Sequence, residues 1–165
     1  MKLKFTRKTW YFFLLVAAGA SMINGLAVLM GVVLADLETV AFALTGITAL
    51  FLAAEKDSTA QAKRRYFLVF VLLMLSYLLV GWAGYLASAL AWPVLLGWER
   101  KSCPQLEAPL RLVCLAEALH LVFVLLSTYG GFTAFYFWAN ILWVLLAVAR
   151  GWGALTLYKA PAEDA

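Results

Sequence analysis

Residues 9–35 read TWYFFLLVAAGASMINGLAVLMGVVLA and contain no charged side chain. The hydrocarbon core of a bilayer is about 30 Å thick, and a helix of about 20 apolar residues can cross it. Three further uncharged runs follow, over residues 39–54, 66–98 and 118–149. The charged residues are therefore confined to short islands between long apolar stretches. This pattern predicts an integral membrane protein that crosses the bilayer several times.

The overall composition leads to the same class of protein. The chain has 165 residues, of which 65% are hydrophobic and only 13% are charged, whereas charged residues make up about 25% of an ordinary soluble domain. There is room for four or five spanning helices and their turns, so we expect one transmembrane helical domain over residues 1–165, with the lipid bilayer as its main partner. The net charge of +4 is small and scattered, which argues against binding to nucleic acid.

The uncharged runs predict four spans, at residues 10–35, 37–54, 66–91 and 132–150. The first follows a basic cluster but is too long for a cleaved signal sequence, so we expect it to remain as a helix. The short charged segment 36–38 predicts a tight turn before the second span. Pro93 is expected to mark the end of the third span, because proline lacks a backbone donor and restricts the residue before it.

The segment 109–128 leaves two topologies open. Residues 109–150 are too long for one spanning helix, and Gly130 and Gly131 predict a break between two helices. Lys and Arg prefer cytoplasmic loops. With a cytoplasmic N-terminus, four spans place ten basic residues inside and three outside, and five spans place eight against five. We therefore expect a small all-α bundle of four transmembrane helices plus one membrane-embedded or interfacial helix, with five spans as the alternative. The expected location is the bacterial inner membrane.

Arg111, Cys114, Glu117 and His120 recur at steps of three residues and would form one ridge on a helix. Ionisable groups at membrane depth are costly and often serve proton, ion or ligand contact. Arg111, Glu117 and His120 are therefore the candidate functional polar cluster. The simpler interpretation, which we favour, places Arg111 and Glu117 at the outer interface with His120 bonded to a neighbouring helix. The chain contains one histidine, so no metal site or bis-histidine haem is predicted, and no catalytic residue is assigned.

Asn24 and Asn140 are the candidate polar residues inside the spans, where an amide needs a hydrogen-bond partner and usually fixes helix packing. Cys103 and Cys114 are the only cysteines. The four-span topology places both on the outer side, where a disulfide is compatible with their spacing and two unpaired thiols are the alternative.

Short loops, stripes of small residues and an aromatic last span favour lateral contacts with protein subunits or self-association. The first functional hypothesis is therefore an accessory or structural subunit of a larger membrane complex. A homo-oligomeric channel or small transporter is the alternative, and an outer-face redox or lipid-modifying enzyme is less favoured. No cofactor is predicted, although the aromatic rings are suited to contact with lipid or quinone.

Overall fold

The computed structural model describes residues 6–32, 34–55 and 58–160. Within these ranges the chain forms six α-helices and one short 3₁₀ helix, and no strand. The expected all-α membrane fold is confirmed. The elements are α1 (Arg7–Leu29), α2 (Ala35–Ala54), α3 (Ala60–Leu78), α4 (Trp82–Glu99), η1 (Pro104–Leu106), α5 (Glu107–Tyr129) and α6 (Ala134–Lys159).

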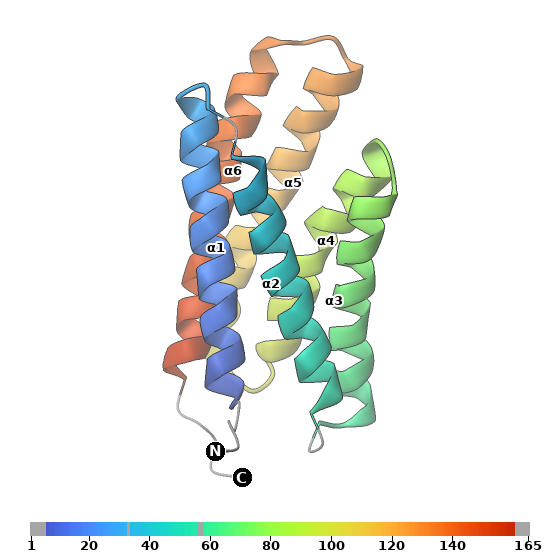
Figure 1. Cartoon of the computed structure of the whole chain (residues 1–165), viewed down its shortest axis with the longest axis vertical. Coiled ribbons are helices and arrows are strands. Elements are labelled where there is room, and N and C mark those ends of the chain that lie inside the picture. The colour runs from blue at the N-terminus through green and yellow to red at the C-terminus, as the bar shows by residue number, and fades with distance from the viewer. Residues whose placement is uncertain (1–5, 33, 56–57, 161–165) are drawn as a thin grey trace.

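The six α-helices run alternately up and down and form a ring in chain order (Figure 1). Each helix packs on the next one along the chain, and α6 returns to pack on α1. The α3–α4 hairpin is shorter than its neighbours in the view of Figure 1 and lies beside α2. The bundle therefore consists of three successive hairpins, and the last helix closes it against the first.

Four segments among the described residues are long and apolar enough to cross a membrane, namely Arg7–Leu29, Asp36–Ala54, Pro104–Tyr129 and Ala134–Lys159. The predicted number of four is thus retained, but the set of helices differs. The segment 109–128 lies within α5, which packs along α6 from end to end of the hairpin (Figure 1). It is one of the four segments that are long and apolar enough to cross a membrane. The predicted break at the glycine pair is confirmed, since α5 ends at Tyr129 and Gly131 has a φ of +70°.

The prediction of one helix over residues 66–91 is wrong. This stretch is divided between α3 and α4, which are joined at Leu79–Gly81. Gly81 has a φ of +80°, a conformation that glycine adopts without steric cost and that lets the chain reverse. Pro93 lies inside α4 and does not end a helix. The predicted third span is therefore divided between the two helices of a hairpin, which returns the chain to the end from which α3 starts.

Two other helix boundaries also differ from the prediction. α1 ends at Leu29, followed by Gly31 with a φ of +81°, and α2 begins at Ala35. Asp36 and Glu38 therefore occupy the first turn of α2, where the helix dipole favours negative charge, and not a loop. α6 continues past Arg150 to Lys159. The Arg150 side chain is largely shielded within the bundle and does not mark the membrane surface.

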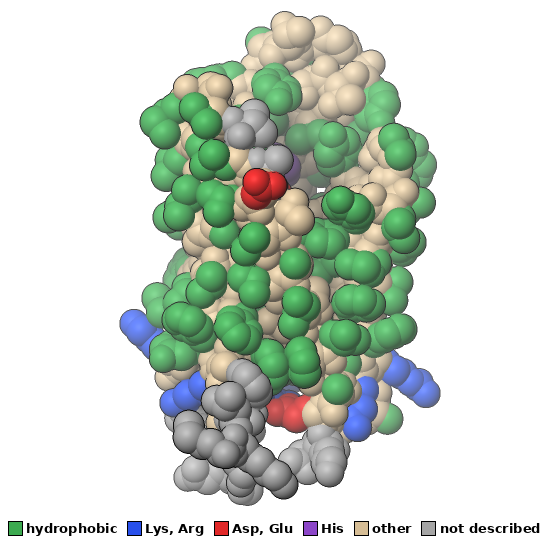
Figure 2. Space-filling view, in the orientation of Figure 1, with side chains coloured by type: hydrophobic (Ala, Val, Ile, Leu, Met, Phe, Trp, Pro, Cys, Tyr) green, Lys and Arg blue, Asp and Glu red, His purple; other side chains and the backbone are tan. Residues whose placement is uncertain are grey.

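Most of the described basic residues gather at one end of the bundle. The starts of α1, α3 and α5 and the ends of α2, α4 and α6 all lie at the same end of the bundle (Figure 1). Figure 2 shows the lysine and arginine side chains at this end and an apolar surface above them. We call it the basic end. The opposite turns, over residues 30–34, 79–81 and 130–133, contain no charged residue.

This arrangement corrects the expected distribution of charge. The four-span prediction placed Arg100, Lys101 and Arg111 on the side opposite the N-terminus. In the structure these residues follow the end of α4 and lie in the first turns of α5, so they belong to the basic end. The cause is the α3–α4 hairpin. Two helices lie between α2 and α5 where the sequence predicted one, so the chain returns to the basic end before α5 begins.

The largest apolar core lies toward the basic end. It includes fully buried side chains from all six α-helices, so that this half of the bundle is closely packed between the helices. Its fully buried members include Leu14, Leu52, Tyr66, Val69, Leu95, Leu96, Leu106, Val113, Leu146 and Leu157. Large apolar side chains also cover the outside of the helices (Figure 2), as expected for contact with lipid.

Candidate functional site

The predicted ridge on α5 is separated by helix geometry into two environments. Glu117 is 3% exposed and faces the interior of the bundle. Arg111 is exposed and pairs with Glu107 at 2.8 Å across one turn. Six residues on a helix of 3.6 residues per turn leave two side chains about 120° apart. Arg111 therefore does not join Glu117 and His120, and it is removed from the candidate site.

Glu117 is paired with Arg150 on α6, a partner that the sequence did not suggest. The Oε1 atom of Glu117 accepts hydrogen bonds from Nε of Arg150 at 3.1 Å and from Nη2 at 2.5 Å. The guanidinium also lies 5.7 Å from the ring centre of Trp92 on α4. This pair connects three helices near the middle of the bundle, where the low dielectric strengthens it.

A cavity of about 270 Å³ lies beside this ion pair, in the half of the bundle away from the basic end. His120 and Asn140 line it together with Glu117 and Arg150, so the structure brings together two of the three clustered residues and one of the two asparagines. Its other polar or aromatic lining residues are Glu38, Tyr85, Ser88, Ser127, Thr128, Tyr136 and Trp143. We call this space the polar cavity.

A hydrogen-bonded chain connects the polar cavity to α1 and α2. Ser21 on α1 donates to Oε2 of Glu38 at 3.0 Å, and Nε1 of Trp143 on α6 donates to the Ser21 hydroxyl at 3.3 Å. The ring of Trp143 lies 6.5 Å from that of His120. Glu38 is therefore an inward-facing carboxylate, although its sequence position suggested a solvated turn.

Asn24 has a different environment from Asn140. Its Oδ1 accepts a hydrogen bond from the backbone N–H of Leu34 at 3.0 Å, and the residue is 2% exposed. It thereby holds the turn between α1 and α2. Asn24 does not line the polar cavity, so the structure supports a packing role for this residue.

Cys103 and Cys114 are both free thiols, the first buried and the second exposed. The considered disulfide is not formed, because Cys103 lies in the turn before η1 while Cys114 points outward from the second turn of α5. Both residues lie toward the basic end. The prediction had placed them on the opposite side.

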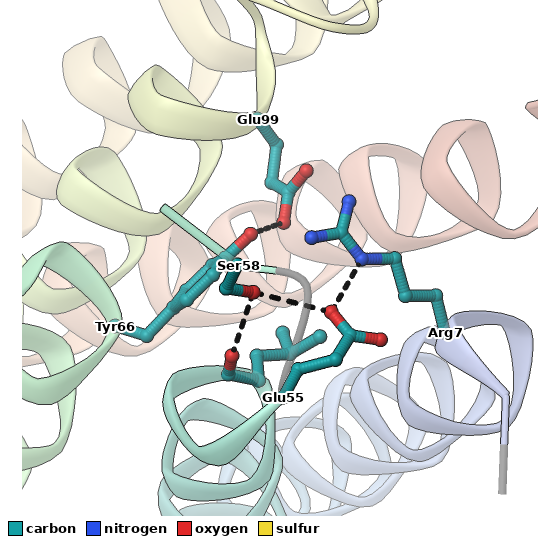
Figure 3. Close-up of polar contacts among 6 residues, drawn as sticks. Arg7, Glu55, Ser58, Tyr66 and Glu99 are labelled. Carbon is teal, nitrogen blue, oxygen red and sulfur yellow. Dashed lines mark hydrogen bonds and ion pairs between the residues drawn. The ribbon is translucent and has the colours of Figure 1, made fainter. Parts of the chain in front are cut away.

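A second polar cluster, which sequence reasoning missed, lies at the basic end (Figure 3). Arg7 pairs with Glu55 at 2.7 Å, and Ser58 donates to the same carboxylate at 3.3 Å. Beside them, the Tyr66 hydroxyl donates to Oε1 of Glu99 at 2.5 Å. Glu99, which lies outside the four candidate spans, is 2% exposed, and this burial raises the pKa of its carboxyl group.

This second cluster connects the ends of four helices. Arg7 and Glu55 join α1 to the end of α2, and Tyr66 and Glu99 join α3 to α4. Figure 3 shows the Arg7 guanidinium and the Glu99 carboxylate pointing toward one another. The only sequence signal was the presence of charged residues beside predicted helix ends, which is also the pattern of solvated residues.

Within the described ranges, no group of three or more His, Cys, Asp and Glu side chains has the geometry to hold a metal ion. The comparisons with known proteins give no match: no protein-family model, no curated sequence and no solved structure is similar to this chain. The functional interpretation therefore depends on the geometry of the polar cavity.

Proposed function

We propose that this protein is a small membrane carrier that binds a solute in the polar cavity and moves it across the bilayer. The observation that supports this proposal is a cavity lined by two carboxylates, an arginine, a histidine and an asparagine at membrane depth. Ionisable groups in this position usually face a substrate or ion pathway, because exposure to lipid is costly. One chain supplies all of these groups, so the carrier does not require the homo-oligomer that the sequence suggested.

The uneven packing of the bundle supports alternating access. The polar cavity lies in the half away from the basic end, and Tyr85 and Tyr136 at its rim are 43% and 63% exposed. The apolar core and the cluster of Arg7, Glu55, Tyr66 and Glu99 close the opposite half. A carrier with this packing is open on one side and closed on the other, and separation of the helix ends at the basic end would reverse this state.

We propose that the basic end faces the cytoplasm, as expected for the bacterial inner membrane, because Lys and Arg prefer that side. In a variant with both native cysteines replaced by serine, Thr133→Cys should react with a membrane-impermeant maleimide in intact cells. Lys101→Cys should react only after the membrane is opened. The measurement is gel-shift labelling of the full chain, and the opposite pattern would place the basic end outside.

Asn140→Ala should reduce solute uptake by about tenfold, which corresponds to about 1.4 kcal/mol. The amide lines the polar cavity, and the loss of one hydrogen bond to a bound solute has an effect of this size. The measurement is uptake into proteoliposomes of three small radiolabelled probes: tetramethylammonium, methanesulfonate and erythritol. We expect at least one of them to enter faster than into protein-free liposomes.

Asn24→Ala is the matched control for the uptake experiment. It removes an asparagine side chain that lies on α1 and bonds the backbone N–H of Leu34 in the following turn, and it should lower thermal stability without changing uptake per folded molecule. If none of the three probes enters, the carrier proposal is rejected. If a probe enters and Asn140→Ala transports it normally, Asn140 does not lie on the pathway.

A role as an accessory subunit is the second candidate. It is favoured by exposed aromatic side chains at the start of α6, where Tyr136, Phe137 and Trp138 are each more than half exposed. Such a surface is suited to lateral contact with another membrane protein, and also to contact with lipid or quinone. Native mass spectrometry of the extracted protein distinguishes the two roles. A partner present in fixed stoichiometry supports the subunit, and an isolated stable chain counts against it.

A further inference from the structure

We infer that the polar cavity binds a small cation, with the carboxylate of Glu38 as its counter-charge. This inference rests on the carrier proposal and adds the charge class of the solute. It depends on three observations, namely the charges that face the cavity, the contacts that each of them already makes, and the aromatic side chains around them.

The arginine in the polar cavity is already neutralised. Two nitrogens of Arg150 donate to one oxygen of Glu117, and the guanidinium also lies near the ring of Trp92. The side chain of Arg150 is only 11% exposed. An anionic solute would have to compete with Glu117 for this guanidinium, and displacement would leave a buried carboxylate unpaired at a high cost. The geometry therefore disfavours an anion.

Glu38 is the carboxylate that remains. It lines both the polar cavity and a smaller neighbouring space of about 30 Å³ that also reaches Ser21 and Trp92. None of the ion pairs among the described residues includes Glu38, and the Ser21 hydroxyl donates to one of its two oxygens. With histidine counted as neutral, Glu38, Glu117 and Arg150 leave one net negative charge facing the cavity.

The aromatic side chains of the polar cavity fit the same ligand class. Tyr85, Tyr136 and Trp143 come from α4 and α6, and the Trp143 ring is held by its hydrogen bond to Ser21. Aromatic faces attract cations, and quaternary ammonium groups are recognised in this way. A volume of about 270 Å³ is slightly below the roughly 300 to 1,000 Å³ of pockets for drug-sized ligands, so the cation is small.

Glu38→Gln tests this inference on the full-length protein. The amide keeps the shape of the side chain and its contact with Ser21 but removes the charge. Binding of tetramethylammonium to the purified protein, measured by isothermal titration calorimetry, should weaken by about tenfold, equal to about 1.4 kcal/mol. Asp36→Asn is the matched control, because Asp36 is an exposed carboxylate two residues away that does not line the cavity. It should bind tetramethylammonium like the unchanged protein.

The outcomes separate the cation inference from the carrier proposal. Tetramethylammonium binding that depends on Glu38 supports the inference even if no uptake is measured. If methanesulfonate or erythritol is taken up and tetramethylammonium is not, the carrier proposal is retained and the cation inference is overturned. The cation inference is also overturned if tetramethylammonium does not bind, or if Glu38→Gln and the unchanged protein bind it equally.

Discussion

Arg150→Met should destabilise the folded protein by about 3–5 kcal/mol, the largest effect that we expect from a single change. Removal of one partner of a buried ion pair leaves the other charge unpaired in a low dielectric. Glu117 would be that charge, since its described hydrogen bonds both come from Arg150 and it is 3% exposed. The measurement is thermal unfolding in detergent, followed by the helical circular dichroism signal.

Two further variants test whether the unpaired charge is the cause. Arg150→Met combined with Glu117→Met should recover most of the lost stability, because two apolar side chains of similar size often replace a buried pair without loss. Arg111→Met removes an exposed arginine from a pair with Glu107 and should leave the stability almost unchanged, because water screens the pair. A double variant as unstable as Arg150→Met alone would mean that the guanidinium stabilises the bundle through other contacts, such as that with Trp92.

Gly84→Ala should cost about 1–3 kcal/mol or more and disturb the α3–α4 hairpin. A Cβ atom at this position would lie 2.4 Å from the carbonyl oxygen of Leu79 and 3.1 Å from that of Ser76. Both are backbone atoms that cannot rotate away, so the end of α3 must shift from the start of α4. The measurement is again thermal unfolding, together with proteolysis at the turn between these helices.

Gly97→Ala is the control for the hairpin, since it lies on the same helix with no atom within 4 Å of an added Cβ. Alanine is favoured over glycine inside a helix by about 0.5–1 kcal/mol, so this variant should be as stable as the unchanged protein or slightly more stable. Equal stabilities of Gly84→Ala and Gly97→Ala would contradict the close contact between α3 and α4.

The sequence predicted the class of the fold because lipid demands long uncharged helices, and residues 9–35 meet that demand. It did not predict the α3–α4 hairpin. Turns in soluble proteins are marked by polar residues, but Leu79, Val80 and Gly81 form an apolar turn, and its only signal is one glycine. Because this turn was not predicted, Arg100 and Lys101 were assigned to the wrong side of the membrane.

The candidate site was predicted in part for a similar reason. Glu117, His120 and Asn140 were recognisable because polar residues are rare within apolar runs. Arg150 and Glu38 were not, since each lies at the edge of an uncharged run and has the pattern of a residue at the membrane surface. Only the packing of α6 against α5 and of α2 against α1 turns these two side chains inward.

The ring in chain order has a consequence for synthesis at the ribosome. The α1–α2 and α3–α4 hairpins pack on each other through α2 and α3, so both can assemble as they emerge. The Glu117–Arg150 ion pair forms later, because Arg150 is synthesised 33 residues after Glu117. During that interval a nascent chain carries an unpaired carboxylate in α5 and lacks the helix that joins α1 to α5. The arrival of α6 neutralises this charge and closes the ring in one step, so the last helix made completes the bundle.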